Sequence, residues 1–169
     1  MIRIGLFGDT HSHLDPQLFH TFKDCDQLWH TGDVGNVQLL EQVEAFKPLK
    51  GVYGNIDGHK IRAIFPKDLI FMCEGVKIFM THIGGYPGRY PASLRKRLEI
   101  IRPDLFICGH SHILKVIYDK QYNFLHINPG ACGLQGWHQM KTVIRFTIDG
   151  PQIKNLEVVE LGLRGKINT

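Results

Sequence analysis

The chain has 169 residues, of which 43% are hydrophobic and 21% are charged. This composition is typical of a globular protein and excludes an intrinsically disordered chain. No apolar run approaches the ~20 residues that a membrane-spanning helix needs. The first residues, MIRI, lack the basic and apolar stretches of a secretion signal. We therefore expect a single domain over residues 1–169, without membrane association.

Charge and cysteine content narrow the class of protein further. Lys and Arg number 20 against 16 Asp and Glu, and the net charge of +4 permits a phosphate-bearing ligand without indicating nucleic-acid binding. The four cysteines, which form no CxxC pair, are Cys25, Cys73, Cys108 and Cys132. This spacing favours buried free thiols in a reducing cytoplasm over disulfides or a cysteine-zinc site.

Strand and helix patterns alternate through the first part of the chain. The strands predicted there are residues 2–7, 26–30 and 49–53. Asp15 followed by Pro16 is typical of a helix N-terminus. Asn36 is expected to cap a second helix, which ends before Pro48. His20 and His30 fall on a helix and a strand pattern, and we expect both to be packing residues.

The second part of the chain is richer in strands. Residues 69–72 and 76–80 predict a hairpin, and residues 91–102 predict the clearest helix, which Pro103 closes. The other predicted strands are residues 104–108, 114–118, 122–127, 141–148 and 152–160. Because an α/β start is followed by strands alone, we expect a mixed sheet or two stacked sheets flanked by helices.

Several predicted strands end in a side chain that can bind a metal, usually directly after a glycine. These side chains are Asp9, His11, Asp33, Asn55, His82, His110 and His112. Because the carboxyl ends of parallel strands share one edge of an open α/β sheet, we expect them to meet in one crevice. Each residue alone is more typical of a turn or a structural histidine. Five such strand ends in one chain favour a common site over coincidence.

The donor set comprises four histidines, two aspartates and one asparagine, without sulfur. It disfavours a cysteine-type zinc site and the all-oxygen sites of calcium and magnesium. Seven ligands are too many for one tetrahedral ion but suit two ions that share a bridging carboxylate. We therefore expect two divalent transition metal ions, with manganese first and nickel, cobalt, iron or zinc as alternatives.

The ordered motifs resemble the signature of the calcineurin-like metallophosphoesterase superfamily. They are Asp9-x-His11, Gly32-Asp33, Gly54-Asn55, His82 and Gly109-His110-Ser111-His112. The Gly-Asn-x-Asp run at 54–57 and the Asn-Pro-Gly segment at 128–130 are similar to its small single-domain bacterial and archaeal phosphodiesterases. The retromer subunit of the vacuolar sorting machinery belongs to the same branch. This resemblance implies a four-layer αββα sandwich of two mixed β-sheets flanked by helices.

The resemblance also implies roles for the individual residues. One metal would be held by Asp9, His11 and His112, the other by Asn55, His82 and His110, with Asp33 bridging the two. A hydroxide shared by the ions would attack phosphorus in line. Asp33, Asn55 and His82 are therefore expected to be catalytic.

One position departs from the family pattern. Many larger relatives carry a histidine after the Gly-Asn pair that protonates the leaving group, whereas Ile56 here has no proton to donate. Asp57 is expected to be catalytic as a proton donor by position. His13 and His59 are further candidates but are more typical of exposed loop histidines. In the glycine-rich loop after His82, Arg89 is expected to bind substrate phosphate, with a plain connector as the alternative.

The predicted function is a cytoplasmic, metal-dependent hydrolase of a small phosphodiester. A non-catalytic scaffold of the retromer-subunit type is the alternative from another class, and a phosphomonoesterase is the alternative within the same chemistry. The complete set of seven ligands favours an enzyme, because a scaffold has no need of it. A nucleic-acid partner is disfavoured by the small net charge and the lack of a basic stripe. A homo-oligomer is left open by the sequence.

Overall fold

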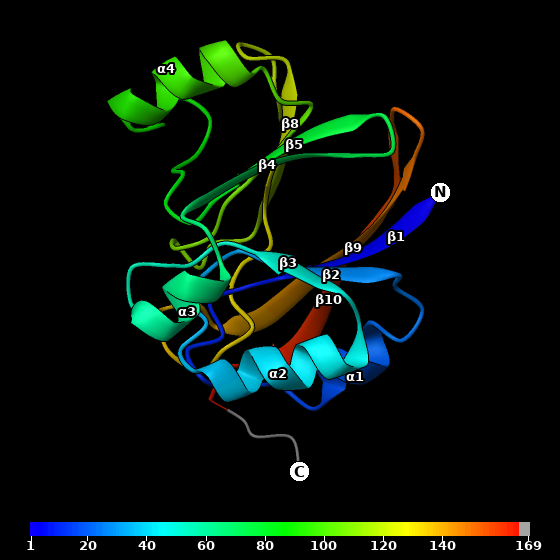
Figure 1. The fold of residues 1–169 in the computed structure, drawn as a ribbon, viewed down its shortest axis with the longest axis vertical. Coiled ribbons are helices and arrows are strands. Elements are labelled where there is room, and N and C mark those ends of the chain that lie inside the picture. Colours follow the sequence, from blue (N-terminus) through cyan, green and yellow to red (C-terminus); the bar gives the residue numbers. More distant parts are fainter. Residues whose placement is uncertain (166–169) are drawn as a thin grey trace.

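The computed structural model describes residues 1–165, and in them two five-stranded sheets and four helices form (Figure 1). The helices are α1 (Gln17–Thr21), α2 (Val37–Phe46), α3 (His59–Ile64) and α4 (Ala92–Ile101). The strands are β1 (Ile2–Phe7), β2 (Gln27–His30), β3 (Leu49–Gly51), β4 (Asp68–Cys73), β5 (Val76–Thr81), β6 (Leu105–Ile107), β7 (Lys115–Asp119), β8 (Phe124–Asn128), β9 (Met140–Asp149) and β10 (Gln152–Leu163).

Both sheets are mixed, and each has parallel strands next to antiparallel ones. The first sheet has the order β10-β9-β1-β2-β3, in which β1, β2 and β3 are parallel. The second has the order β4-β5-β6-β8-β7, in which β5, β6 and β8 are parallel. The carboxyl ends of three parallel strands therefore meet at one edge of each sheet, where ligands bind in α/β folds.

Three separate apolar layers hold the fold together. Between the sheets, Trp29 of the first packs with Met80 and Ile107 of the second in a fully buried cluster. A second cluster fixes α1, α2 and α3 to the outer face of the first sheet, and a third fixes α4 to the second. Figure 1 shows these helices on the two outer sides of the paired sheets. The arrangement confirms the predicted four-layer αββα sandwich.

The local signals read from the sequence are largely confirmed. The Oδ1 of Asn36 accepts a hydrogen bond from the backbone N–H of Leu39 at 2.9 Å and caps α2. The predicted hairpin forms from β4 and β5, and the predicted helix 91–102 is α4. Helix α3 was not predicted, because its six residues bury only Ile61 and give no apolar stripe. His20 was expected to pack but is exposed on α1.

All four cysteines are buried free thiols, as predicted. Burial raises the pKa of Cys25 to about 11 and that of Cys108 and Cys132 to about 12, which keeps these thiols protonated and unreactive at neutral pH. Among the helices of residues 1–165, none has the length and apolar character that crossing a bilayer requires.

Candidate metal centre

The seven predicted ligands all lie just after parallel strands. Asp9 and His11 follow β1, Asp33 follows β2, and Asn55 follows β3 in the first sheet. From the second sheet, His82 directly follows β5, and His110 and His112 follow β6. The site therefore forms where the carboxyl edges of the two sheets meet, and each sheet supplies part of it.

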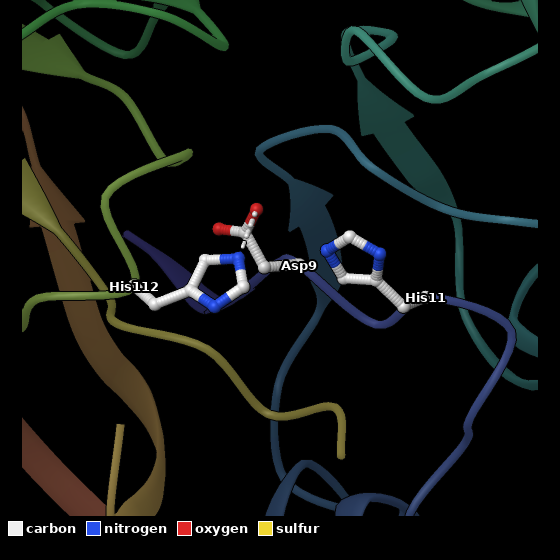
Figure 2. Close-up of side chains that lie close together, drawn as sticks. All are labelled: Asp9, His11 and His112. Carbon is white, nitrogen blue, oxygen red and sulfur yellow. Dashed lines mark ion pairs between the residues drawn. The ribbon is translucent and has the colours of Figure 1, made fainter. Parts of the chain in front are cut away.

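The structure brings six of the seven residues together as two groups of three. In the first, ligand atoms of Asp9, His11 and His112 lie within 4.8 Å of one another (Figure 2). In the second, the same is true of Asp33, His82 and His110. The seventh residue, Asn55, lines the same cavity as His82. The first group has the same members as the first ligand set that the resemblance implies, and the second has Asp33 beside His82 and His110 in place of Asn55. That these residues bind metal stays a prediction.

Asp33 connects the two groups. Its Oδ1 lies 3.3 Å from Nε2 of His82, and its Oδ2 lies 3.5 Å from Nε2 of His11. Asp9 makes a similar approach, with its Oδ1 3.3 Å from Nε2 of His112 and 3.9 Å from Nε2 of His82. The carboxylate of Asp33 thus has one oxygen facing each group, which is the arrangement that a bridging ligand requires.

Several of these atoms lack any hydrogen-bond partner. Asp9 Oδ1, His11 Nε2 and His82 Nε2 are all buried and unpaired. Buried polar atoms without partners are rare and cost free energy, so a group of them calls for a physical explanation. Bound cations would satisfy all three atoms. The mixed nitrogen and oxygen donors fit divalent transition metals and do not fit an all-oxygen calcium site.

A backbone carbonyl group fixes the orientation of the His82 ring. Its Nδ1 lies 2.8 Å from the carbonyl oxygen of Thr31, which can only accept, so Nδ1 carries a hydrogen. The Nε2 atom therefore faces the two aspartates, and metal-binding histidines are commonly held in this way. Burial opposes a charge on His82, but the nearby carboxylates of Asp33 and Asp9 outweigh it and raise the pKa. The same local field favours a bound cation.

Asp33 has the complementary electrostatics. Its burial disfavours a charged carboxylate, yet the close approach and charge of the His82 ring, with the backbone N–H of Ile56, outweigh this and lower the pKa. Asp33 is therefore ionised at neutral pH and available as an anionic ligand.

Five of the site residues have left-handed backbone conformations. Their φ angles are 49° at Asp9, 45° at His11, 53° at Asp33, 69° at His110 and 58° at His112. Such conformations cost about 1–3 kcal/mol each in residues other than glycine and persist only where the surroundings enforce them. Hydrogen bonds between the loops after β1 and β2 hold these conformations in place, including the bond from His11 N–H to Asp33 O at 3.0 Å.

A buried histidine ties these two loops together. The Nδ1 of His30 accepts from the Gly32 N–H at 3.0 Å, so its Nε2 donates to Thr10 Oγ1, also at 3.0 Å. The Thr10 hydroxyl in turn donates to Val34 O at 2.9 Å. Complete burial lowers the pKa of His30 to about 3, which keeps the ring neutral. His30 is buried as predicted, and the structure adds a positioning role that its strand pattern could not show.

The structure places the carboxylate of Asp57, the predicted proton donor, against the backbone of two loops. Its buried carboxylate accepts three backbone hydrogen bonds, from Gly54 at 2.8 Å, Gly35 at 2.9 Å and Val34 at 3.1 Å. Both oxygens of this carboxylate are therefore engaged by the backbone. Asp57 instead fixes the loop that carries Asn55 to the loop that carries Asp33.

A cavity of about 390 Å³ opens beside His82 and Asn55. The predicted substrate-binding residue Arg89 is exposed and does not line it. His13 and His59 lie outside both groups of ligand atoms. The cavity instead receives cationic side chains that the sequence analysis did not find. They are Arg62 of α3, Lys67 before β4 and Arg97 of α4. The spacing of these three residues in the sequence does not predict that they are neighbours, because only the fold brings α3 and α4 to one cavity.

Comparisons with known proteins find relatives of similar sequence and of similar fold. A probable metallophosphoesterase of Methanothermobacter thermautotrophicus is 27% identical over 94% of this chain and 92% of its own. The solved structure of an archaeal phosphodiesterase superposes with a TM-score of 0.76 and 22% identity, over 95% of this chain and all of that one. Vps29 of Chaetomium thermophilum superposes with a TM-score of 0.74 and 15% identity, over 95% and 97% of the two chains.

The family comparison confirms the resemblance that the motifs indicated. The model of the calcineurin-like phosphoesterase superfamily domain matches residues 2–150, which include all seven predicted ligands. The chain belongs to the calcineurin-like phosphoesterase superfamily.

Proposed function

We propose that this protein is a dinuclear metal-dependent phosphodiesterase that hydrolyses small phosphodiesters. The observation that carries the proposal is the position of Asp33, whose two carboxylate oxygens face His11 of one ligand group and His82 of the other. Two metal ions that shared Asp33 as a ligand would stabilise both the attacking and the leaving oxygen of an in-line displacement at phosphorus. A relative named as a phosphodiesterase, 25% identical over 78% of this chain, supports the diester preference.

Each ligand has a part in this mechanism. Asp9, His11 and His112 would hold one ion, while His82 and His110 would hold the other, with Asp33 shared. We propose Asn55, which lines the cavity beside His82, as a further ligand of the second ion. When bound, the ions would lower the pKa of a water nucleophile and neutralise charge on the phosphoryl oxygens. We infer manganese as the first choice, since carboxylate donors suit it, with nickel, cobalt, iron and zinc as alternatives because of the imidazole donors.

Protonation of the leaving group limits the substrate. Ile56 has no proton to donate, and the carboxylate of Asp57 is engaged by three backbone N–H groups. We therefore propose that the best substrates have leaving groups that depart without protonation. The buried free thiols agree with a reducing compartment, and we propose that the enzyme acts in the cytoplasm.

The test is metal-dependent hydrolysis of a matched pair of esters. The protein is stripped of metal and reloaded with Mn, Ni, Co, Zn or Mg, and the cleavage of bis(p-nitrophenyl) phosphate and p-nitrophenyl phosphate is followed. Asp33→Ala removes the shared carboxylate and is expected to lose most metal and activity. Asp24→Ala removes an exposed carboxylate elsewhere on the surface and serves as the control. Faster monoester than diester cleavage would favour the phosphomonoesterase alternative.

The similarity to Vps29 structures supports a second candidate, a non-catalytic interaction scaffold. That likeness is one of fold only, and a scaffold does not need seven converging ligands. Wild-type protein that binds metal but cleaves neither ester with any of the five ions would favour the scaffold. Near-normal metal content in Asp33→Ala, measured by elemental analysis, would contradict the bridging role.

A further inference from the structure

We propose that the cavity beside His82 and Asn55 binds a second phosphate group of the substrate through Arg62 and Lys67. The inference rests on the proposed function and narrows the substrate to diesters that carry a phosphate monoester in addition to the scissile phosphate.

The cavity is placed to receive a part of the substrate next to the reacting phosphorus. Asn55 and His82, two ligands of the proposed second metal, form part of its wall. Apolar surface comes from Tyr53, Ile83 and Leu94. A volume of about 390 Å³ lies within the range of small-molecule sites. A substrate whose phosphodiester sits at the metal centre can therefore extend into this cavity.

The charge of the cavity is unbalanced. Three cationic side chains and one carboxylate line it, in addition to the metal ligands. Arg97 neutralises that carboxylate, since its Nη1 lies 2.8 Å from Oδ2 of Asp68, and its guanidinium also lies over the ring of Phe79. Within residues 1–165, neither Arg62 nor Lys67 forms an ion pair with a carboxylate. Two positive charges are thus left for a ligand.

Arg62 is held in place before any ligand arrives. Its Nε donates to the carbonyl oxygen of Asp57 at 2.7 Å, and its guanidinium carbon lies 4.5 Å from the centre of the Tyr53 ring. These contacts fix the plane of the guanidinium and leave its terminal N–H groups available. A fixed guanidinium loses little side-chain entropy when it binds an oxyanion, so the site is preorganised.

The size of the charge favours a phosphate over a carboxylate. A phosphate monoester carries a charge of about −1.5 to −2 at pH 7, whereas a carboxylate carries −1. The former matches the two unpaired cations of Arg62 and Lys67. The planar guanidinium also fits two phosphate oxygens at once, and the ammonium of Lys67 adds a third contact.

A matched pair of ligands tests the binding of this second phosphate. The metal-loaded wild-type protein is titrated by calorimetry with thymidine 5′-monophosphate and with thymidine 3′,5′-bisphosphate, which differ only in the 3′-phosphate. We expect the bisphosphate to bind at least tenfold more tightly, and the difference to shrink as salt is raised. Equal affinity of the two nucleotides would overturn the proposal, whatever the catalytic activity of the protein.

Substitutions of Arg62 and Lys67 test whether the difference in affinity between the two nucleotides arises in this cavity. In the double variant Arg62→Gln, Lys67→Gln, the ratio of the two affinities is expected to fall to about one. Lys60→Gln removes a charge from the same helix but outside the cavity, and it is expected to keep the wild-type ratio. A ratio that persists in the double variant would place the second phosphate elsewhere and overturn the assignment to this cavity.

Hydrolysis separates this inference from the proposed function. The p-nitrophenyl ester of thymidine 5′-monophosphate is compared with the same ester that also carries a 3′-phosphate. Cleavage of both with a tenfold higher kcat/KM for the second supports both proposals. Cleavage of both with equal kcat/KM contradicts the second-phosphate site alone. If neither ester is cleaved but the calorimetric preference is present, the proposed function fails and the binding site stands.

Discussion

The Asp33 carboxylate joins histidines from the two sheets, with Oδ1 3.3 Å from Nε2 of His82 and Oδ2 3.5 Å from Nε2 of His11. His11 follows a strand of the first sheet, and His82 follows a strand of the second. The site therefore spans the sandwich, and metal ions bound there would tie its two sheets together. Its chemistry and the stability of this edge of the fold depend on the same side chains.

Metal removal is expected to lower thermal stability. A ligand at 1,000 times its dissociation constant stabilises the folded state by about 4 kcal/mol, which is worth roughly 10 °C in Tm for a domain of this size. We expect a Tm decrease of about that size when chelator strips metal from the wild type. Asp33→Ala should show little further decrease, because it holds little metal. Equal chelator sensitivity of both proteins in calorimetric scans would argue against the shared ligand.

Asp57→Asn distinguishes a positioning role from proton donation. The amide presents one acceptor oxygen and an NH₂ group to three N–H donors, so at least one buried donor loses its partner. We expect a loss of about 1–3 kcal/mol in the free energy of unfolding, measured with denaturant, and weaker metal binding. A proton donor would instead leave stability intact and remove one limb of the pH–rate profile. Asp24→Asn is the control.

Gly54 is required by a close approach to the metal centre. A Cβ at this position would lie 2.0 Å from Oδ1 of Asp33 and 2.3 Å from its backbone nitrogen. Gly54→Ala must therefore displace Asp33, and we expect metal affinity to fall about 10–100-fold, the range seen when groups supporting ligands are lost. The control is Gly58→Ala, where a Cβ meets nothing within 4 Å. Equal metal affinities by competitive titration would contradict this account.

Because two histidines are buried, we expect the free energy of unfolding to decrease in acid. Burial lowers the pKa of His30 to about 3 and of His126 to about 4, whereas an unfolded histidine titrates near 6.5. Between pH 6.5 and 4 the unfolded chain binds more protons than the folded one, so acid favours unfolding. Each histidine contributes a slope of about 1.4 kcal/mol per pH unit.

Substitution tests this slope directly. The free energy of unfolding is measured with denaturant from pH 7 to pH 4. His126→Phe should reduce its dependence on pH by the contribution of one histidine, about 1.4 kcal/mol per pH unit. His20→Gln alters an exposed histidine on α1 and serves as the control substitution. A slope unchanged by His126→Phe would show that this ring does not titrate on unfolding.

A buried ion pair supports the start of the chain's first helix. Lys141 and Asp15 are 1% and 2% exposed, and the Lys141 Nζ donates to Asp15 Oδ2. Lys141→Met leaves a buried carboxylate without its cation, at an expected loss of about 3–5 kcal/mol in the free energy of unfolding. The exposed pair of Lys154 and Asp149 provides the comparison, and Lys154→Met should cost about 1 kcal/mol or less. Similar losses in both variants would contradict the role of burial.

The sequence identified the candidate ligands because their signals are local. Asp33 and His82 each stand directly after an apolar strand, and the rule that parallel strands share a carboxyl edge places such residues together. The Asn36 cap and the hairpin at Glu74 are local in the same sense, since the bonds that define them span a few residues. The layered architecture followed from the family resemblance.

Only the tertiary structure decided which side chains surround those ligands. Asp57 appeared to be a free acid in the sequence, but its partner Val34 lies 23 residues away and becomes a neighbour only when two loops meet. Arg62 and Arg97 reach one cavity from helices on opposite sides of the sandwich, and Arg89, closer in sequence to His82, does not. Such neighbours depend on the packing of the whole chain. A local pattern of residue types therefore does not predict them.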